Sequence, residues 1–368
     1  MSTTLFLVIA LVETAVIGGM FLLYPRFARR GLLFGVYVGE EVSGGREARA
    51  ITASWYRAMI AWLVASVVAE VALGAVAQTQ LLIGLFPLVI SAGFVVFYVR
   101  AYFQAKAFAV EHTAPAVAIV QAGPEPSLAL PLVALAAGVI AGLVAIAYAA
   151  SSYAALPARV PTHFGLSGMP DVWRPKSFFS VMLLPMLTLL VGIGLGLISV
   201  FTARAKRAVR YPGTDISLRA QVRFRLAVTR MLSTVSLLVA VMLMLMTIST
   251  IRVGLGLERA IPWPLLVLSL AIVAVGVVGS IYIGLRYGQG GSRLEREAAS
   301  APLTNGLADN RHWVLGAFYV NRDDPSLLVE DRFGLGYTLN FGNWKAVAAL
   351  AGFLLALLAL VAAAVIVE

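Results

Sequence analysis

Residue types that could do chemistry gather in one segment of the sequence, between Leu156 and Ser177. His163 and Asp171 could pair there, with the carboxylate orienting the imidazole ring or holding its proton, and Lys176 could neutralise the carboxylate. One histidine and one aspartate are too few ligands for zinc, which takes at least three protein groups. Three interpretations stay open: side chains that hold the segment's own turns, a surface that recognises a peptide, toxin or partner protein, and a metal or catalytic site.

The backbone of this segment is expected to be ordered without forming a simple helix. Its four prolines and two glycines restrict the backbone and favour turns. Phe164 and Trp173 are expected to seat the segment at the membrane interface, where aromatic rings are favoured. We predict a lid or plug that packs on the outer ends of the helices.

Two carboxylates, Glu13 and Glu70, stand inside otherwise apolar stretches. Counting along each predicted helix places both roughly 10–12 Å below the outer membrane surface, so the two could meet. Because charges are costly in lipid, they would form a cation or proton site, or a pair that shares one proton. The alternative is two protonated or snorkelling groups that hydrogen-bond neighbouring helices.

Complete catalytic motifs are missing from the sequence. It has no HExxH, GxSxG or phosphate-binding loop, and it contains 0 cysteines. We therefore expect a protein that is not an enzyme and that holds no metal or cofactor.

The elements that must position these residues are membrane helices. Of the 368 residues 60% are hydrophobic and 12% charged, and the apolar residues form blocks of about twenty, the length that crosses a bilayer. We predict an all-α polytopic membrane protein with about eight transmembrane helices and a small cytoplasmic β-rich module before the last helix. The predicted spans are Leu5–Tyr24, Ala58–Ala77, Leu81–Phe103, Leu128–Ala150, Phe178–Thr202, Ala227–Ile251, Pro264–Leu285 and Ala346–Val367.

Positive charge sets the predicted orientation. The stretches after the first, third, fifth and seventh spans hold 23 of the 28 lysines and arginines, so they are placed in the cytoplasm. Both termini and the His163 segment then lie outside a bacterial inner membrane. The basic run from Arg204 to Arg225 is interpreted as a topology signal in contact with anionic lipid, with a dedicated lipid or nucleic-acid site as the alternative. Nucleic acid is not an expected partner.

The predicted module lies between Arg286 and Lys345. Aromatic and β-branched residues between turn-forming residues predict two or three short strands after His312, which must lean on helices or on another chain because they cannot bury a core alone. Its polar residues favour turn capping and a local ion pair, with a docking surface or a nucleotide site as alternatives. The candidate residues are Trp313, Tyr319, Asn321, Asp324, Arg332 and Asn340.

These predictions divide the chain into five regions. A three-helix membrane region spans 1–127, and a loop domain with two flanking helices spans 128–202. A two-helix region with a basic cytoplasmic loop spans 203–285. The β-rich module spans 286–345, and the last transmembrane helix spans 346–368.

Two strings resemble known bacterial domains. Pro161-Thr162-His163-Phe164, followed by Gly168, Asp171, Trp173 and Lys176, resembles the signature of a domain of unknown function found in SdpI-like membrane proteins. The namesake of those proteins gives immunity to a secreted killing toxin. The resemblance covers roughly Ala137–Leu197 and implies that these loop residues meet an extracytoplasmic ligand, although this chain carries extra helices on both sides. Positions from Trp313 to Gly342 resemble a short uncharacterised C-terminal domain that accompanies the first and implies no activity.

The sequence therefore favours a membrane sensor or immunity-like protein that recognises an extracytoplasmic ligand, such as a peptide, through its outside loop. The first alternative is an accessory subunit of a larger membrane complex. The second is an ion- or proton-coupled transporter, which only Glu13 and Glu70 favour. Membrane lipids are the expected partner in every case.

Overall fold

The computed structural model describes residues 3–28, 31–74, 76, 83–110, 127–165, 167–205, 215–295, 310–332 and 336–366. Within these residues eight helices are long and apolar enough to cross a membrane, which confirms the predicted fold class. They are α1 (Thr3–Phe27), α3 (Arg46–Gly74), α5 (Phe86–Lys106), α6 (Ala129–Ser152), α7 (Phe178–Ala203), α8 (Asp215–Gly254), α9 (Trp263–Tyr287) and α11 (Trp344–Ile366).

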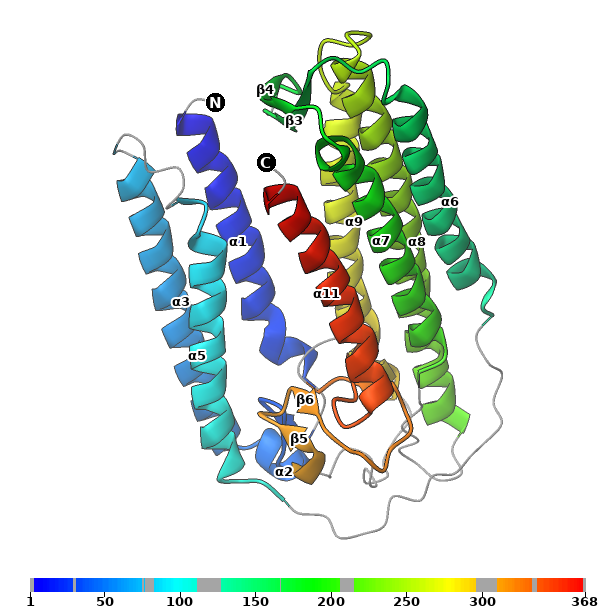
Figure 1. Ribbon diagram of the computed structural model, residues 1–368. Coiled ribbons are helices and arrows are strands. Elements are labelled where there is room, and N and C mark those ends of the chain that lie inside the picture. Colours follow the sequence, from blue (N-terminus) through cyan, green and yellow to red (C-terminus); the bar gives the residue numbers. More distant parts are fainter. Residues whose placement is uncertain are drawn as a thin grey trace.

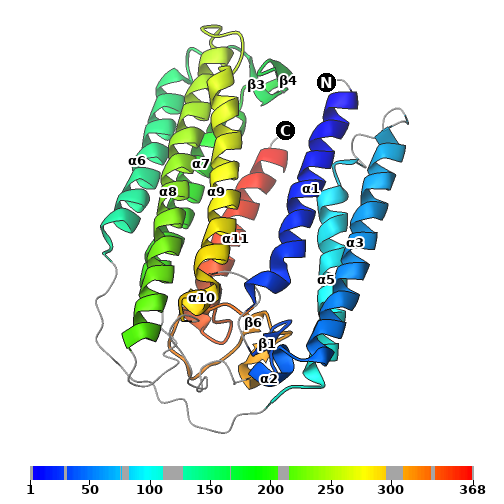
Figure 2. The same ribbon diagram turned by 180° about the vertical axis from the view of Figure 1, so that it is seen from behind.

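The helices form two groups (Figures 1 and 2). In one group α6, α7 and α8 pack against each other, α9 adds to α8, and α11 adds to α7. In the other group α1 packs on α3 and α5. Helices α6 and α7 cross in close contact at Gly138 and Gly192, where a Cβ on Gly138 would lie 2.6 Å from the Gly192 carbonyl oxygen. Small residues permit such close contact between membrane helices.

Two helices start well before the predicted spans. Helix α8 begins at Asp215, and α3 begins at Arg46. The extra turns of α8 are more polar than its membrane span, yet they bury Phe224 completely, and this ring packs in a cluster with Ile283 of α9. A hydropathy pattern detects lipid contact, so it stops where the helix leaves the apolar layer even though the helix continues.

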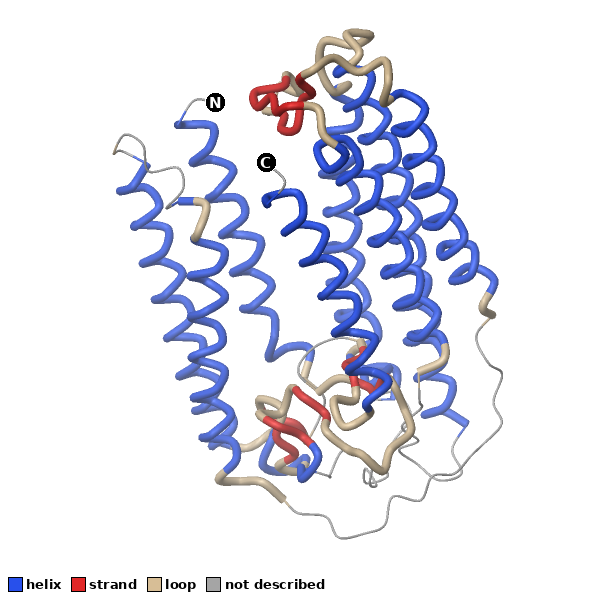
Figure 3. Tube along the Cα trace, viewed as in Figure 1, coloured by secondary structure: helices blue, strands red, loops and turns tan. Residues whose placement is uncertain are grey.

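Short strands cap the two ends of the bundle (Figure 3). Strands β3 (Arg159–Phe164) and β4 (Pro170–Pro175) form a hairpin at the end we call the hairpin end. Helix α1 begins and α11 ends at this same end (Figure 1). At the opposite end, the module end, lie β1 (Leu32–Leu33), β2 (Val36–Tyr37), α2 (Glu40–Ser43), η1 (Gln289–Gly291), α10 (Ser292–Glu295), η2 (Asn310–His312), β5 (Trp313–Val314), β6 (Phe318–Tyr319), β7 (Leu328–Glu330) and β8 (Tyr337–Leu339).

Among the described residues the strands form four antiparallel two-stranded sheets: β1–β2, β3–β4, β5–β6 and β7–β8. The module thus holds four strands after His312, where the sequence predicted two or three. A bridge between Tyr319 and Asn340 connects the last two hairpins. The β1–β2 hairpin also belongs to the module, although the sequence placed residues 32–37 in the N-terminal membrane region.

An aromatic core positions the module end. Tyr24, Phe34, Trp55, Phe94 and Tyr98 are all buried in one cluster where α1, α3 and α5 meet the β1–β2 turn. The rings of Phe94 and Tyr98 stack with centroids 6.1 Å apart, and Tyr24 meets Tyr98 edge to face at 5.6 Å. Such pairs add to the free energy of burial, so the turn is held rigidly against the helices.

Candidate functional site: the hairpin and the pocket beneath it

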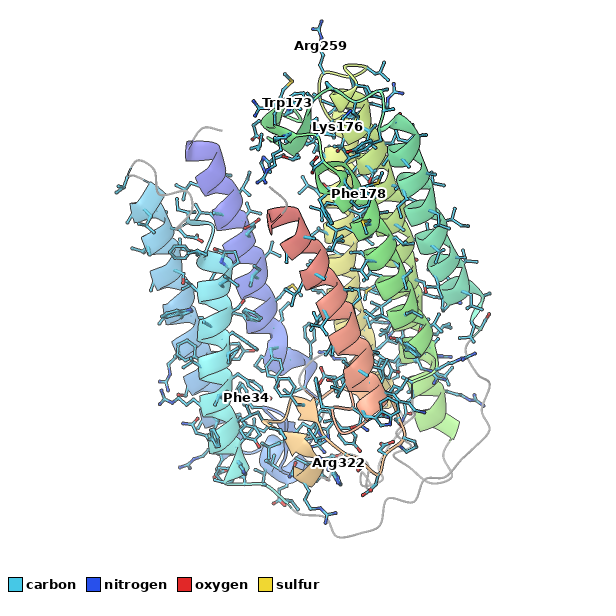
Figure 4. The ribbon with its side chains drawn as sticks, in the orientation of Figure 1. Phe34, Trp173, Lys176, Phe178, Arg259 and Arg322 are labelled. Atoms are coloured by element: carbon cyan, nitrogen blue, oxygen red, sulfur yellow. The ribbon has the colours of Figure 1, made fainter. Side chains whose placement is uncertain are left out.

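The β3–β4 hairpin is built on the ends of the neighbouring helices. Lys176 donates from Nζ to the carbonyl oxygens of Leu156 (2.7 Å) and Tyr153 (3.3 Å), just beyond the C-terminus of α6. A cation there stabilises the unpaired carbonyls and the helix dipole. Of the interpretations that the sequence left open for Lys176, these contacts agree with a side chain that holds the segment's own backbone, and among the described residues no ion pair joins it to Asp171. Lys176 and Trp173 lie at the hairpin end in Figure 4.

The tip of the hairpin is fixed by Gly168. Its carbonyl oxygen accepts a 2.8 Å hydrogen bond from the backbone N–H of Ile261, which lies in the loop between α8 and α9. Gly168 has φ +76°, and a Cβ there would lie 2.5 Å from the Ile261 carbonyl oxygen. Only glycine meets both conditions without strain. The hairpin is therefore seated at its base and at its tip, as the predicted lid required.

His163 and Asp171 form the predicted pair. The His163 Nδ1 and Asp171 Oδ1 atoms lie 2.5 Å apart, and the two side chains are 66% and 51% exposed. A carboxylate on Nδ1 favours the tautomer with its proton on that nitrogen, which leaves Nε2 to meet a ligand. Irregular register around His163 in the β3–β4 pairing sets the direction of this side chain. Among the described residues no group of three metal-ligating side chains is present.

A pocket of about 700 Å³ lies under the hairpin. His163, Phe164 and Arg174 line it from the hairpin side, and α7 and α8 form its walls, together with Val361 near the end of α11. Phe164 therefore lines the pocket, whereas Trp173 is 39% exposed, with its carbonyl oxygen accepting a 2.8 Å hydrogen bond from Arg159. The pocket could not be predicted from the sequence, because its walls come from helix faces far apart in the chain.

At the module end Asn340 organises the backbone. Its side chain is completely buried and donates to the carbonyl oxygens of Asn321 (2.8 Å) and Asp324 (2.9 Å). It also accepts from the backbone N–H groups of Asn321 (3.1 Å) and Gly342 (3.0 Å). Asp324 accepts from the Tyr319 hydroxyl at 3.2 Å and from the Ser326 N–H at 3.0 Å. These contacts agree with the turn-capping interpretation of Asn321 and Asp324, one of those that the sequence left open.

Arg332 connects the module to the β1–β2 hairpin. It is 4% exposed, donates to Asn310 Oδ1 at 3.1 Å, and lies 4.9 Å above the Trp313 ring. Asn310 in turn pairs with the backbone N–H and carbonyl of Tyr37, at 2.9 and 3.1 Å. Burial, and then the Glu40 carboxylate, raises the pKa of the Tyr37 phenol.

Sequence reasoning missed two residues that join the module to the membrane helices. Gln289 is 1% exposed and exchanges hydrogen bonds with both backbone groups of Gly336, at 2.8 and 2.9 Å. The Tyr98 hydroxyl donates to the carbonyl oxygens of Phe34 (3.2 Å) and Leu315 (3.0 Å). A lone glutamine just after a span and a tyrosine inside one were the only signals in the sequence.

The two intramembrane carboxylates have different environments. Glu70 is completely buried, and its Oε1 accepts a 2.6 Å hydrogen bond from the buried hydroxyl of Thr14. Glu13 lies on the adjacent position of α1 and is exposed. Among the described residues no hydrogen bond joins the two carboxyl groups, so the structure places Glu70 in a contact between α1 and α3.

Part of the basic run lies outside the described residues, namely Lys206, Arg207 and Arg210. Arg225 is described and is buried, and its Nη1 donates to the Ala205 carbonyl oxygen at 3.0 Å, between the ends of α7 and α8. The nucleotide-site alternative depends on the glycine pair in Gly334-Leu335-Gly336, of which Gly334 and Leu335 likewise lie outside the described residues.

Two family profiles match short segments of the chain. One, a domain of unknown function (DUF1648), matches residues 139–189, which hold the second part of α6, the hairpin and the first part of α7. That domain is found in SdpI-like proteins. The other, a family of unknown function (DUF5808), matches residues 322–347 of the module, so Trp313, Tyr319 and Asn321 precede it. No curated protein and no solved structure matches the chain.

Proposed function

We propose that the chain is a non-enzymatic sensor or immunity-like protein of a bacterial inner membrane, and that its β3–β4 hairpin recognises a ligand outside the cytoplasm. One observation carries the proposal: His163, whose exposed ring pairs with the exposed Asp171 carboxylate, lines a pocket of about 700 Å³. Side chains that only held the hairpin's turns would need neither this exposure nor a pocket. A concave apolar site with a few polar groups is the usual form of a binding site.

The proposed orientation rests on charge. The stretches after the first, third, fifth and seventh predicted spans hold 23 of the 28 lysines and arginines, and the remaining stretches hold 5. Positive charge is retained in the cytoplasm during insertion, so the hairpin faces outward. The domain match at residues 139–189 supports the same class of role, because it coincides with the hairpin and its two helices.

The rival roles gain less support. The accessory-subunit role was favoured by a module too small to fold alone, but Gln289 and Tyr98 seat the module on the chain's own helices. The transporter role needs two carboxylates that act together, and Glu70 is bonded to Thr14.

A single-cysteine experiment tests the proposal, because the chain contains 0 cysteines. Met169, at the hairpin tip, is 51% exposed, so Met169→Cys gives a label site with little change in packing. In intact cells a membrane-impermeant maleimide should label it, and lack of labelling would contradict the orientation. Peptide and lipid fractions of the culture medium are then added separately, and one of them should slow labelling. His163→Ala and Asp171→Asn should abolish that slowing.

A further inference from the structure

The β5–β6 hairpin of the module carries apolar side chains on both of its faces. Successive residues of a strand point to opposite sides, so Trp313 and Tyr319 share one face, and Val314 and Phe318 share the other. Trp313 is buried, and its ring lies 5.3 Å from that of Tyr319. Val314 and Phe318 are 52% and 47% exposed. The face of a hairpin that meets water is usually polar, so the second face of this hairpin is suited to an apolar surface.

The exposed apolar face extends beyond these two residues to the start of α11. Val320 is also exposed and follows Phe318 on the same side of the strand. The ring of Phe318 meets that of Phe341 edge to face, with centroids 5.5 Å apart. Trp344, three residues further on, opens α11 and is 73% exposed. We call these five residues, Val314, Phe318, Val320, Phe341 and Trp344, the module face.

The module face is continuous with the side of α11 that contacts lipid. Helix α11 is apolar enough to cross a membrane from Trp344 onward, and Val347, Leu354 and Leu358 are exposed along the same side of it as Trp344. Tryptophan is favoured where a span meets the lipid head groups, so Trp344 marks the level of the bilayer surface. The Lys345 ammonium group lies 5.9 Å from the centre of the Trp344 ring, and a cation at this level can contact lipid phosphates.

We infer that the module face lies on the bilayer surface at the module end, with Val314 and Phe318 among the lipid head groups and the first carbons of the acyl chains. An apolar protein face at an interface of this kind is buried about 5–10 Å into the boundary between head groups and chains. The bilayer then holds the module together with the hydrogen bonds of Gln289 and Tyr98. A protein is the competing occupant of the module face, and it is an outcome of the test.

The test compares single cysteines on and off the module face, because the chain contains 0 cysteines. Val314→Cys lies on the face, whereas Arg322→Cys replaces an exposed residue that Figure 4 shows beyond the start of α11. Each full-length variant is labelled with the fluorophore NBD and placed as a single copy in nanodiscs of phosphatidylcholine and phosphatidylglycerol. Quenching by a phosphatidylcholine with a nitroxide near the start of its acyl chain measures lipid contact, and quenching by iodide measures contact with water.

The lipid nitroxide should quench the label at Val314→Cys about threefold or more strongly than the label at Arg322→Cys, and iodide should quench them in the opposite order. Phe318→Cys, on the same face, should behave like Val314→Cys, which excludes a local effect of one substitution. If iodide quenches both face positions as strongly as Arg322→Cys, the module face meets water and the inference is overturned. If the face positions are protected from both quenchers, protein rather than lipid covers the face, and the inference fails as well.

Discussion

Replacing Asn340 with alanine should open the β-rich module locally while leaving the membrane helices intact. The side chain is completely buried and makes four hydrogen bonds to backbone groups, two donated and two accepted. At about 1 kcal/mol net for each bond, their loss predicts about 4 kcal/mol, and about 3 kcal/mol if water enters the space left behind. Every 1.4 kcal/mol is a factor of ten, so the opening equilibrium should rise roughly 100- to 1000-fold.

Hydrogen exchange followed by mass spectrometry measures this directly. The amides of Asn321 and Gly342 bond to the Asn340 Oδ1, so peptides that contain them should exchange faster in the variant. Peptides from α6 and α7 should keep their wild-type rates. Arg322→Ala is the matched control, because Arg322 is exposed at the module end, as Figure 4 shows, and its loss should change exchange by less than about threefold. Equal exchange in the Asn340→Ala variant and the control would refute the reasoning.

Three further substitutions probe the remaining contacts. Gly35→Ala should lower the melting temperature in detergent more than Gly39→Ala does. Both glycines have positive φ, so both substitutions strain the backbone. A Cβ on Gly35 would also lie 2.6 Å from the Gly316 carbonyl oxygen, whereas a Cβ on Gly39 would meet nothing within 4 Å. Equal shifts would mean that the contact between the two turns is unimportant. Tyr98→Phe removes the hydroxyl proton that the Phe34 and Leu315 carbonyl oxygens share. It should cost about 1–2 kcal/mol in denaturant unfolding followed by tryptophan fluorescence, and an unchanged midpoint would contradict the bridging role. Lys176→Ala should speed trypsin cleavage after Arg159 several-fold, because the base of the hairpin loses its anchor, and wild-type cleavage kinetics would argue against that anchor.

The membrane helices could be predicted from the sequence because the bilayer imposes a fixed length. Each span needs about twenty apolar residues, and that pattern is local in the chain. The start of α8 could not be predicted in the same way. Its first turns are polar, and what stabilises the later ones is a contact between Phe224 and Ile283 of another helix. Long-range packing of this kind leaves no local pattern.

For the candidate site, the His163–Asp171 pair could be predicted from the sequence, but the pocket beside it could not. His163 and Asp171 are eight positions apart, and their types alone favoured a pair, which the structure contains. For Lys176 the sequence left two partners open, Asp171 and the segment's own backbone, because the carbonyl groups beyond the end of α6 that it bonds cannot be identified from a local pattern. The pocket combines the hairpin with α7, α8 and Val361, so it exists only in the folded chain.

The carboxylates show why depth along a helix can be predicted when direction cannot. Counting residues from the end of a helix gives depth, and it placed Glu13 and Glu70 at one level. The direction in which a side chain faces depends on its rotation about the helix axis, and at 3.6 residues per turn the side chains of adjacent positions point about 100° apart. Thr14, one position after Glu13, therefore faces α3 and donates to Glu70, while Glu13 itself is exposed. The Thr14 hydroxyl stabilises one oxygen of this buried carboxyl group, so the contact joins α1 to α3.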